Sequence, residues 1–139
     1  MPTQPAGYSG TPLPKKLGIR PGHRVAFLHA PDDFAATLGA LPEEVEVVEA
    51  DAGPLDLAVF FTTRADALPA AFRGLGPRVH PGGTLWIGWP KKASKVPTDV
   101  TEDVVRAVGL AEGMVDVKVC AIDAVWSGLK FVYRLADRR

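Results

Sequence analysis

The stretch Leu57-Ala58-Val59-Phe60-Phe61-Thr62-Thr63 decides the fold class of this chain. Its five consecutive apolar residues predict a strand that is buried on both faces, as strands of parallel sheets are. Thr63, with Asp66 three residues later, resembles a capping box and predicts a helix that carries Leu68 and Phe72 on one face. A buried strand that leads into a helix is the repeating unit of α/β proteins.

Two runs before this stretch predict two further strands. The run Arg24-Val25-Ala26-Phe27-Leu28-His29 is apolar enough to be buried on both faces. A helix is expected after it, because Asp33 can cap a helix whose Phe34 and Leu38 share one face. Residues 45–49 form the second strand. Only about seven residues separate it from the third, whereas a parallel crossover usually takes a dozen or more. Either an extended return replaces a helix there, or strand 45–49 runs antiparallel.

The residues after the stretch predict one more strand and a helix. Residues 84–89 form an apolar run that suits a fourth strand. Val100, Val104 and Val108 then recur at four-residue intervals on one helical face, with Asp99 as the capping residue. Trp86 and Trp89 stand three apart on the strand and are expected to point to opposite faces of the sheet.

A hairpin is expected to close the chain. Residues 115–122 and 129–135 are rich in β-branched and aromatic residues, and Trp126-Ser127-Gly128 is the expected turn between them. Trp126 either anchors the turn on the sheet or offers a contact to another chain, and we favour the anchor. The predicted fold is α/β: a single, mostly parallel sheet of about six strands, flanked by helices and closed by an antiparallel C-terminal hairpin.

Composition limits the classes of function. The 139 residues have the size of one domain, and 16 basic residues balance 16 acidic ones. Without a net field, binding to nucleic acid or to an anionic membrane surface is not expected. Cys120 lies in an apolar run and is interpreted as a small buried hydrophobe. No histidine or cysteine pair has the spacing of metal ligands, so no metal site is predicted.

The N-terminus is rich in proline and glycine. We interpret residues 1–19 as an extended arm whose apolar residues Leu13, Leu17 and Ile19 lie along the domain, and residues 20–139 as one α/β domain. The start of the chain lacks the features of a signal peptide, and no apolar run reaches the ~18 residues of a membrane span. A cytoplasmic location is therefore expected.

The candidate ligand site lies at the carboxyl ends of the strands, where open α/β sheets bind their ligands. A lysine-rich loop between two prolines follows strand 84–89, and its cations predict an anion site. Trp89 could stack on the ligand or on the N-terminal arm around Tyr8. The alternative is a solvated loop whose charges serve solubility. The predicted ligand-binding residues are Arg64, Trp89, Lys91, Lys92, Ser94 and Lys95, with Thr98 as a further hydroxyl donor.

No set of catalytic residues is predicted. His29, near Asp32, is the only histidine placed for acid–base chemistry, and it is interpreted as the cap of its strand. Ser94 and Ser127 lack the surroundings of a nucleophile elbow.

Three motifs carry a resemblance to known families: Tyr8-Ser9-Gly10-Thr11-Pro12-Leu13, Trp89-Pro90-Lys91-Lys92-Ala93-Ser94 and Trp126-Ser127-Gly128-Leu129. They resemble an uncharacterised bacterial family known as a domain of unknown function. The order of elements over residues 20–135 resembles the class I S-adenosylmethionine-dependent methyltransferase fold, shortened by about one β-α unit. That second resemblance implies S-adenosylmethionine as a cofactor, with Glu49 or Asp51 in the position of the ribose-binding acid.

The stretch after the first strand departs from the methyltransferase pattern. Those enzymes have an acidic residue and a run of glycines there, whereas this chain has His29-Ala30-Pro31-Asp32-Asp33-Phe34. The leading prediction is therefore a non-catalytic α/β module without a cofactor, which binds a partner protein or a small anionic ligand at the rim. A degenerate methyltransferase that binds S-adenosylmethionine is the alternative. A third prediction is a subunit or scaffold whose N-terminal arm or terminal hairpin docks on another chain, a homo-oligomer being one such case, because edge strands need cover.

Overall fold

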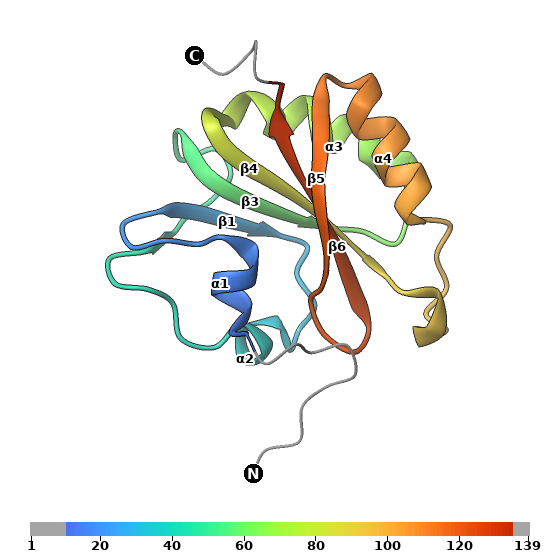
Figure 1. Cartoon of the computed structure of the whole chain (residues 1–139), viewed down its shortest axis with the longest axis horizontal. Coiled ribbons are helices and arrows are strands. Elements are labelled where there is room, and N and C mark those ends of the chain that lie inside the picture. The colour runs from blue at the N-terminus through green and yellow to red at the C-terminus, as the bar shows by residue number, and fades with distance from the viewer. Residues whose placement is uncertain (1–10, 135–139) are drawn as a thin grey trace.

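The computed structural model describes residues 11–134. One six-stranded sheet forms its centre, with helices on both faces (Figure 1). The strands are β1 (Arg24–Leu28), β2 (Glu46–Val47), β3 (Leu55–Phe61), β4 (Val79–Pro90), β5 (Met114–Ala121) and β6 (Trp126–Tyr133). The helices are α1 (Leu13–Leu17), α2 (Phe34–Leu38), α3 (Leu68–Leu75) and α4 (Glu102–Ala111), with 3₁₀ turns at Ala65–Ala67, Gly76–Arg78 and Lys92–Ser94.

The strand order is β2-β1-β3-β4-β6-β5. Strands β2, β1, β3 and β4 are parallel, while β6 pairs antiparallel with both β4 and β5. This arrangement confirms the predicted fold class. It also answers the question of the second strand, because β2 is parallel to β1 and the chain returns to β3 without a helix.

Each face of the sheet packs against its own pair of helices. One core holds residues of α1 and α2 together with Trp86, and the other holds residues of α3 and α4 together with Trp89. The two tryptophans therefore point to opposite faces, as expected from their spacing. The side chains of Leu57 and Val59 from β3 belong to the first core, and those of Ala58 and Phe60 to the second.

The expected extended backbone is replaced by helix α1 at residues 13–17. Pro14 lies in the first turn, where a missing N–H costs no hydrogen bond, and Gly18 ends the helix with a φ of 88°. Leu13 and Leu17 are buried, and the indole of Trp86 donates a 2.9 Å hydrogen bond to the carbonyl of Leu17. The part of the predicted arm before residue 11 lies outside the described residues.

Two helix starts differ from the expectation. Helix α4 begins after Thr101, whose hydroxyl accepts a hydrogen bond from the N–H of Val104, so Asp99 is not the cap. Helix α3 has no side-chain cap, and Asp66 pairs with Arg64 instead of closing a capping box. Asp99 accepts a hydrogen bond from the N–H of Ala65 instead, so its carboxylate serves the loop before α3.

The hairpin turn lies earlier than expected. Trp126 is the first residue of β6, and the turn consists of residues 122–125, where Asp123 accepts hydrogen bonds from the N–H groups of Val125 and Trp126. The ring of Trp126 packs edge-on against Phe61 with centroids 5.4 Å apart. This contact confirms the anchor interpretation.

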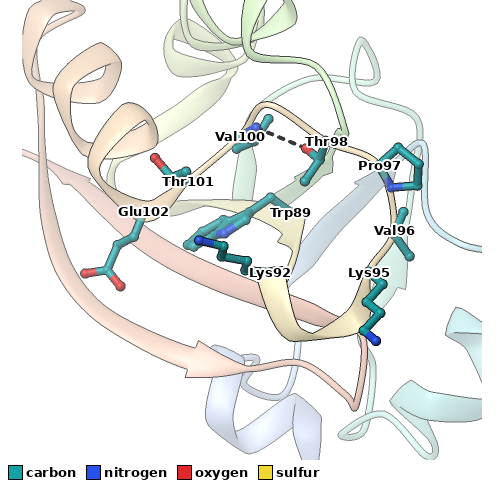
Figure 2. A pocket seen from close by; sticks show the side chains of 9 residues that line it. All are labelled: Trp89, Lys92, Lys95, Val96, Pro97, Thr98, Val100, Thr101 and Glu102. Atoms are coloured by element: carbon teal, nitrogen blue, oxygen red, sulfur yellow. Dashed lines mark hydrogen bonds between the residues drawn. The ribbon is translucent and has the colours of Figure 1, made fainter.

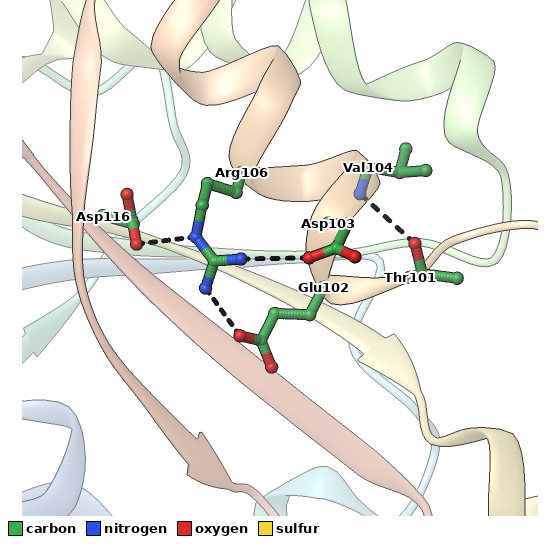
Figure 3. Close-up of polar contacts among 6 residues, drawn as sticks. All are labelled: Thr101, Glu102, Asp103, Val104, Arg106 and Asp116. Atoms are coloured by element: carbon green, nitrogen blue, oxygen red, sulfur yellow. Dashed lines mark hydrogen bonds and ion pairs between the residues drawn. The ribbon is translucent and has the colours of Figure 1, made fainter.

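Helix α4 is attached to β5 by charged groups. The guanidinium of Arg106 donates to Asp116 on β5 at 2.9 Å and also to Glu102 and Asp103 on its own helix (Figure 3). The hydrogen bond to Asp116 and then that to Glu102 raise the pKa of Arg106, and the Arg106 guanidinium lowers the pKa of Asp116. The start of α4 is thereby held beside the sheet. Within residues 11–134, no helix has the length and apolar character that a bilayer crossing requires.

Candidate functional site

A crevice opens between the carboxyl ends of β1 and β3. Helix α2, which follows β1, packs on one face of the sheet, and α3, which follows β3, packs on the other. The chain thus leaves two neighbouring strands toward opposite faces, and open α/β sheets bind ligands at such a point. The crevice has a volume of about 350 Å³ and is lined by His29, Phe60, Phe61, Thr62, Thr63, Arg64, Ala67 and Trp126.

Aromatic rings form the walls of this crevice. The ring of His29 meets Phe60 edge-on at 5.4 Å, and the ring of Trp126 meets Phe61 in the same way. His29 has a φ of 58°, a left-handed conformation that is uncommon for a residue with a side chain. Its ring nitrogens have no hydrogen-bond partner in the described part of the chain. The walls can therefore hold a flat group against the rings of Phe60 and Trp126.

Polar groups follow directly at the end of β3. The hydroxyl of Thr62 accepts a hydrogen bond from the N–H of Arg64 at 3.0 Å and closes a tight turn. The hydroxyl of Thr63 has no partner among residues 11–134. The exposed Arg64 guanidinium makes two hydrogen bonds to Asp66, which raise the pKa of Arg64. The crevice thus combines an apolar wall with hydroxyls and one cation.

A second cavity, which we call the β4–α4 pocket, lies between the end of β4 and the start of α4 (Figure 2). Its volume is about 520 Å³. Its lining residues are Trp89, Lys92, Lys95, Val96, Pro97, Thr98, Val100, Thr101 and Glu102.

A short segment, residues 97–99, separates the two cavities. The hydroxyl of Thr98 donates to the carbonyl of Thr63 at 2.7 Å, and Asp99 accepts a hydrogen bond from the N–H of Ala65 at 2.8 Å. Thr63 lines the crevice, while Pro97 and Thr98 line the β4–α4 pocket. The loop after β3 and the loop after β4 are therefore held together at one edge of the sheet.

The predicted rim residues divide between these places. Trp89, Lys92 and Lys95 come together in the β4–α4 pocket, and Arg64 lies in the crevice. The hydroxyl of Ser94 is used within the lysine loop, where it donates to the carbonyl of Lys91 at 2.6 Å. Lys91 is half-buried at the base of the loop, and its N–H donates to the carbonyl of Val125.

Glu49 and Asp51 lie away from both cavities. Strand β2 pairs only with Arg24 and Val25, the first two residues of β1, and the chain then turns back toward β3. Arg24 holds this turn by donating to the carbonyl of Ala52 at 2.6 Å. In Figure 1 the loop of residues 48–54 lies at the start of β3, whereas the crevice lies at the other end of that strand. These two acids are thus not placed at the rim.

The sequence placed the site at the strand ends but did not identify several of the side chains that line the two cavities. Phe60, Phe61 and Trp126 line the crevice, and Val100 and Thr101 line the pocket. The rule that places ligands at strand ends could have found Phe60 and Phe61, since they end β3. Thr101 could not be found, because its position depends on where α4 begins. Among residues 11–134, no group of three histidine, cysteine or acidic side chains could hold a metal ion.

Solved structures of methyltransferases share this fold. The chain is similar to a SAM-dependent methyltransferase from Aquifex aeolicus, with a TM-score of 0.59 and 15% identity over 84% of this chain and 85% of that one. It is also similar to magnesium protoporphyrin IX methyltransferase from Synechocystis with bound SAH (TM-score 0.57, 11% identity, 88% and 78%). A third match is Aeropyrum pernix fibrillarin with natively bound S-adenosyl-L-methionine (0.52, 11%, 91% and 70%). The chain has a small methyltransferase-like fold.

Neither the family models nor the curated proteins match the sequence. The resemblance to an uncharacterised bacterial family therefore stays a prediction. The expectation of no cofactor is corrected by the structural matches, since one is a SAM-dependent methyltransferase and the other two hold bound SAH or S-adenosyl-L-methionine.

The residues after β1 do not form the glycine-rich main-chain cradle that the methyltransferase resemblance implies. Pro31 has no N–H to donate, and its carbonyl accepts the N–H of Phe34. Asp32 and Asp33 add negative charge at the start of α2, which is only five residues long. The side chains of the crevice fit an adenosyl group better, because a flat base can pack on the aromatic wall and hydroxyls can meet Thr62 and Thr63.

Proposed function

We propose that this protein is a small S-adenosylmethionine-dependent methyltransferase that holds its cofactor in the crevice between β1 and β3. One observation carries the proposal: the aromatic and polar cavity lies at the point where the chain leaves β1 and β3 toward opposite faces. The similarity to methyltransferase structures supports it. The absence of a glycine cradle implies that side chains, and not main-chain N–H groups, hold the ligand.

Each group of the crevice has a role in this proposal. The rings of His29, Phe60 and Trp126 pack against the base and keep water from it. The hydroxyl of Thr63, which has no partner among residues 11–134, and the guanidinium of Arg64 hold the polar end. When bound, S-adenosylmethionine supplies a methyl group activated by its positive sulfur.

The protein's part in the reaction is to place the acceptor in line with that methyl group, which can supply much of the rate. A nucleophile with a free lone pair needs no base. Where the acceptor must lose a proton, a ring nitrogen of His29 is free to take it, because no described group occupies it.

The test is calorimetric titration with S-adenosylmethionine and S-adenosylhomocysteine. We expect saturable heat and a rise in melting temperature, because a ligand that binds only the folded state stabilises it. Ala67→Phe fills the crevice and should abolish both effects. Ala70→Phe is the matched control: Ala70 is exposed on α3, outside the crevice, and should leave binding unchanged.

Absence of heat and of stabilisation at millimolar ligand in the wild-type protein would contradict the proposal. Equal binding by the Ala67→Phe and wild-type proteins would show that the ligand lies elsewhere. Binding of a partner protein, and homo-oligomer formation, stay predictions. Light scattering of the purified chain measures the second.

A further inference from the structure

The β4–α4 pocket has the properties of a second small-molecule site, distinct from the crevice. Its volume of about 520 Å³ is in the range of ligand cavities. Trp89, Val96, Pro97 and Val100 give it a largely apolar surface. Residues 97–99 separate it from the crevice, so a ligand here is not the proposed cofactor.

Trp89 brings a hydrogen-bond donor without an acceptor. The residue is only 6% exposed, yet its indole N–H has no acceptor within residues 11–134. No fully buried side-chain nitrogen or oxygen of the described residues lacks a partner, so this N–H must reach solvent. Because Trp89 lines the pocket, the pocket is where a ligand atom can accept the bond.

The other polar groups of the pocket are mostly donors too. The hydroxyl of Thr101 accepts the N–H of Val104, while its own hydrogen has no acceptor in the described part of the chain. Lys92 and Lys95 are exposed and make no ion pair within the same residues. The carboxylate of Glu102 is held by the guanidinium of Arg106 at 2.5 Å (Figure 3). Two cations and two neutral donors thus face one cavity.

We propose that the β4–α4 pocket binds a monocarboxylic acid with a flat apolar body. The body packs on Trp89, Val96 and Val100, and the carboxylate accepts hydrogen bonds from the indole, from Thr101 and from the lysines. An organic carboxylate suits the pocket better than inorganic phosphate, because the largely apolar lining around Trp89 and Val100 needs an apolar body to pack against. This site goes beyond the proposed function and does not depend on it.

The test is NMR titration of the ¹⁵N-labelled protein with 3-phenylpropionate, without any adenosyl compound. Only three tryptophan indoles are present, so the signal of Trp89 can be assigned by its loss in Trp89→Phe. We expect this signal to shift and saturate. The uncharged analogue 3-phenylpropionamide should bind at least roughly tenfold more weakly, because charged hydrogen bonds are the stronger ones. Inorganic phosphate should not compete.

Two variants of the lysine loop, which should both fold normally, test the role of the cations. Replacing Lys92 and Lys95 together by alanine should weaken binding at least roughly tenfold and remove its dependence on salt. Lys91→Ala is the matched control, because Lys91 belongs to the same loop but does not line the pocket. The double variant should keep its affinity for S-adenosylhomocysteine, which separates this site from the crevice.

Three outcomes would overturn the proposal. The first is no shift of the Trp89 indole signal at millimolar 3-phenylpropionate. The second is equal binding of the acid and its amide, and the third is binding of phosphate in place of the acid.

Discussion

At the residue scale, the contact between Gly109 and Phe131 fixes how closely α4 can approach β6. A Cβ atom at Gly109 would overlap the ring of Phe131, which is buried in the middle of β6. Gly109→Ala should therefore lower the free energy of unfolding by about 1–3 kcal/mol, as overpacking of a core does. Urea denaturation measures the change.

The control for this substitution is Gly74→Ala on α3. A methyl group at Gly74 would meet open space, and the backbone there is ordinary helix, so alanine should stabilise the protein by up to about 1 kcal/mol. Equal effects at the two glycines would contradict the packing argument. In a Phe131→Leu background, Gly109→Ala should lower the free energy of unfolding by less than it does in the wild-type protein, and that result would support the packing argument.

Asp56 makes the stability of the folded protein depend on pH. Partial burial opposes its ionisation, but the hydrogen bonds from the N–H of Arg24 and from His80 outweigh that effect and lower the pKa of Asp56. A carboxyl whose pKa is lower in the folded state stabilises the fold above its unfolded pKa, and this stability is lost as the pH falls through the folded pKa.

Asp56→Asn should therefore lower the melting temperature at neutral pH and flatten its fall between roughly pH 5 and pH 3. Asp51→Asn is the control, since Asp51 is exposed in a turn and its side chain makes no hydrogen bond or ion pair with the described residues. Melting curves of both variants across this pH range measure the difference. An unchanged slope in Asp56→Asn would contradict the assignment.

At the element scale, strands were easier to predict than the ends of helices. The apolar runs 57–61 and 84–89 lie within β3 and β4, because strands that are buried on both faces carry such runs. The cap of α4 is Thr101 and not Asp99, since Asp99 binds the N–H of Ala65 in another loop. That contact joins residues 34 positions apart, and no local pattern reveals it.

The length of β2 explains why Glu49 and Asp51 lie away from both cavities. The sequence predicts a strand over residues 45–49, whose end would place both acids at the rim. Only Glu46 and Val47 form β2, and both are exposed at the edge of the sheet. The chain turns back as soon as these two residues have paired with β1. Edge pairing depends on neighbours far along the chain, so the apolar pattern alone could not show where it stops.

At the scale of the whole molecule, both edges of the sheet are short or irregular. The outer strand β5 exposes Val117 and Val119, and its register with β6 shifts between Asp116 and Lys118. A bulge and a lysine at an edge disfavour pairing with another sheet. The predicted homo-oligomer would therefore have to use another surface, or pair with β5 despite these features.

The segment from Pro97 to Asp99 lies between the crevice and the β4–α4 pocket. The Thr98 hydroxyl and the Asp99 carboxylate form hydrogen bonds with Thr63 and Ala65 in the loop after β3, while Pro97 lines the β4–α4 pocket. A ligand that moves residues 97–99 when it binds in one cavity changes the affinity of the other cavity for its own ligand. Thermodynamic reciprocity makes the two changes in affinity equal. Titrating 3-phenylpropionate with and without saturating S-adenosylhomocysteine measures that factor, and identical dissociation constants would mean that this segment is rigid.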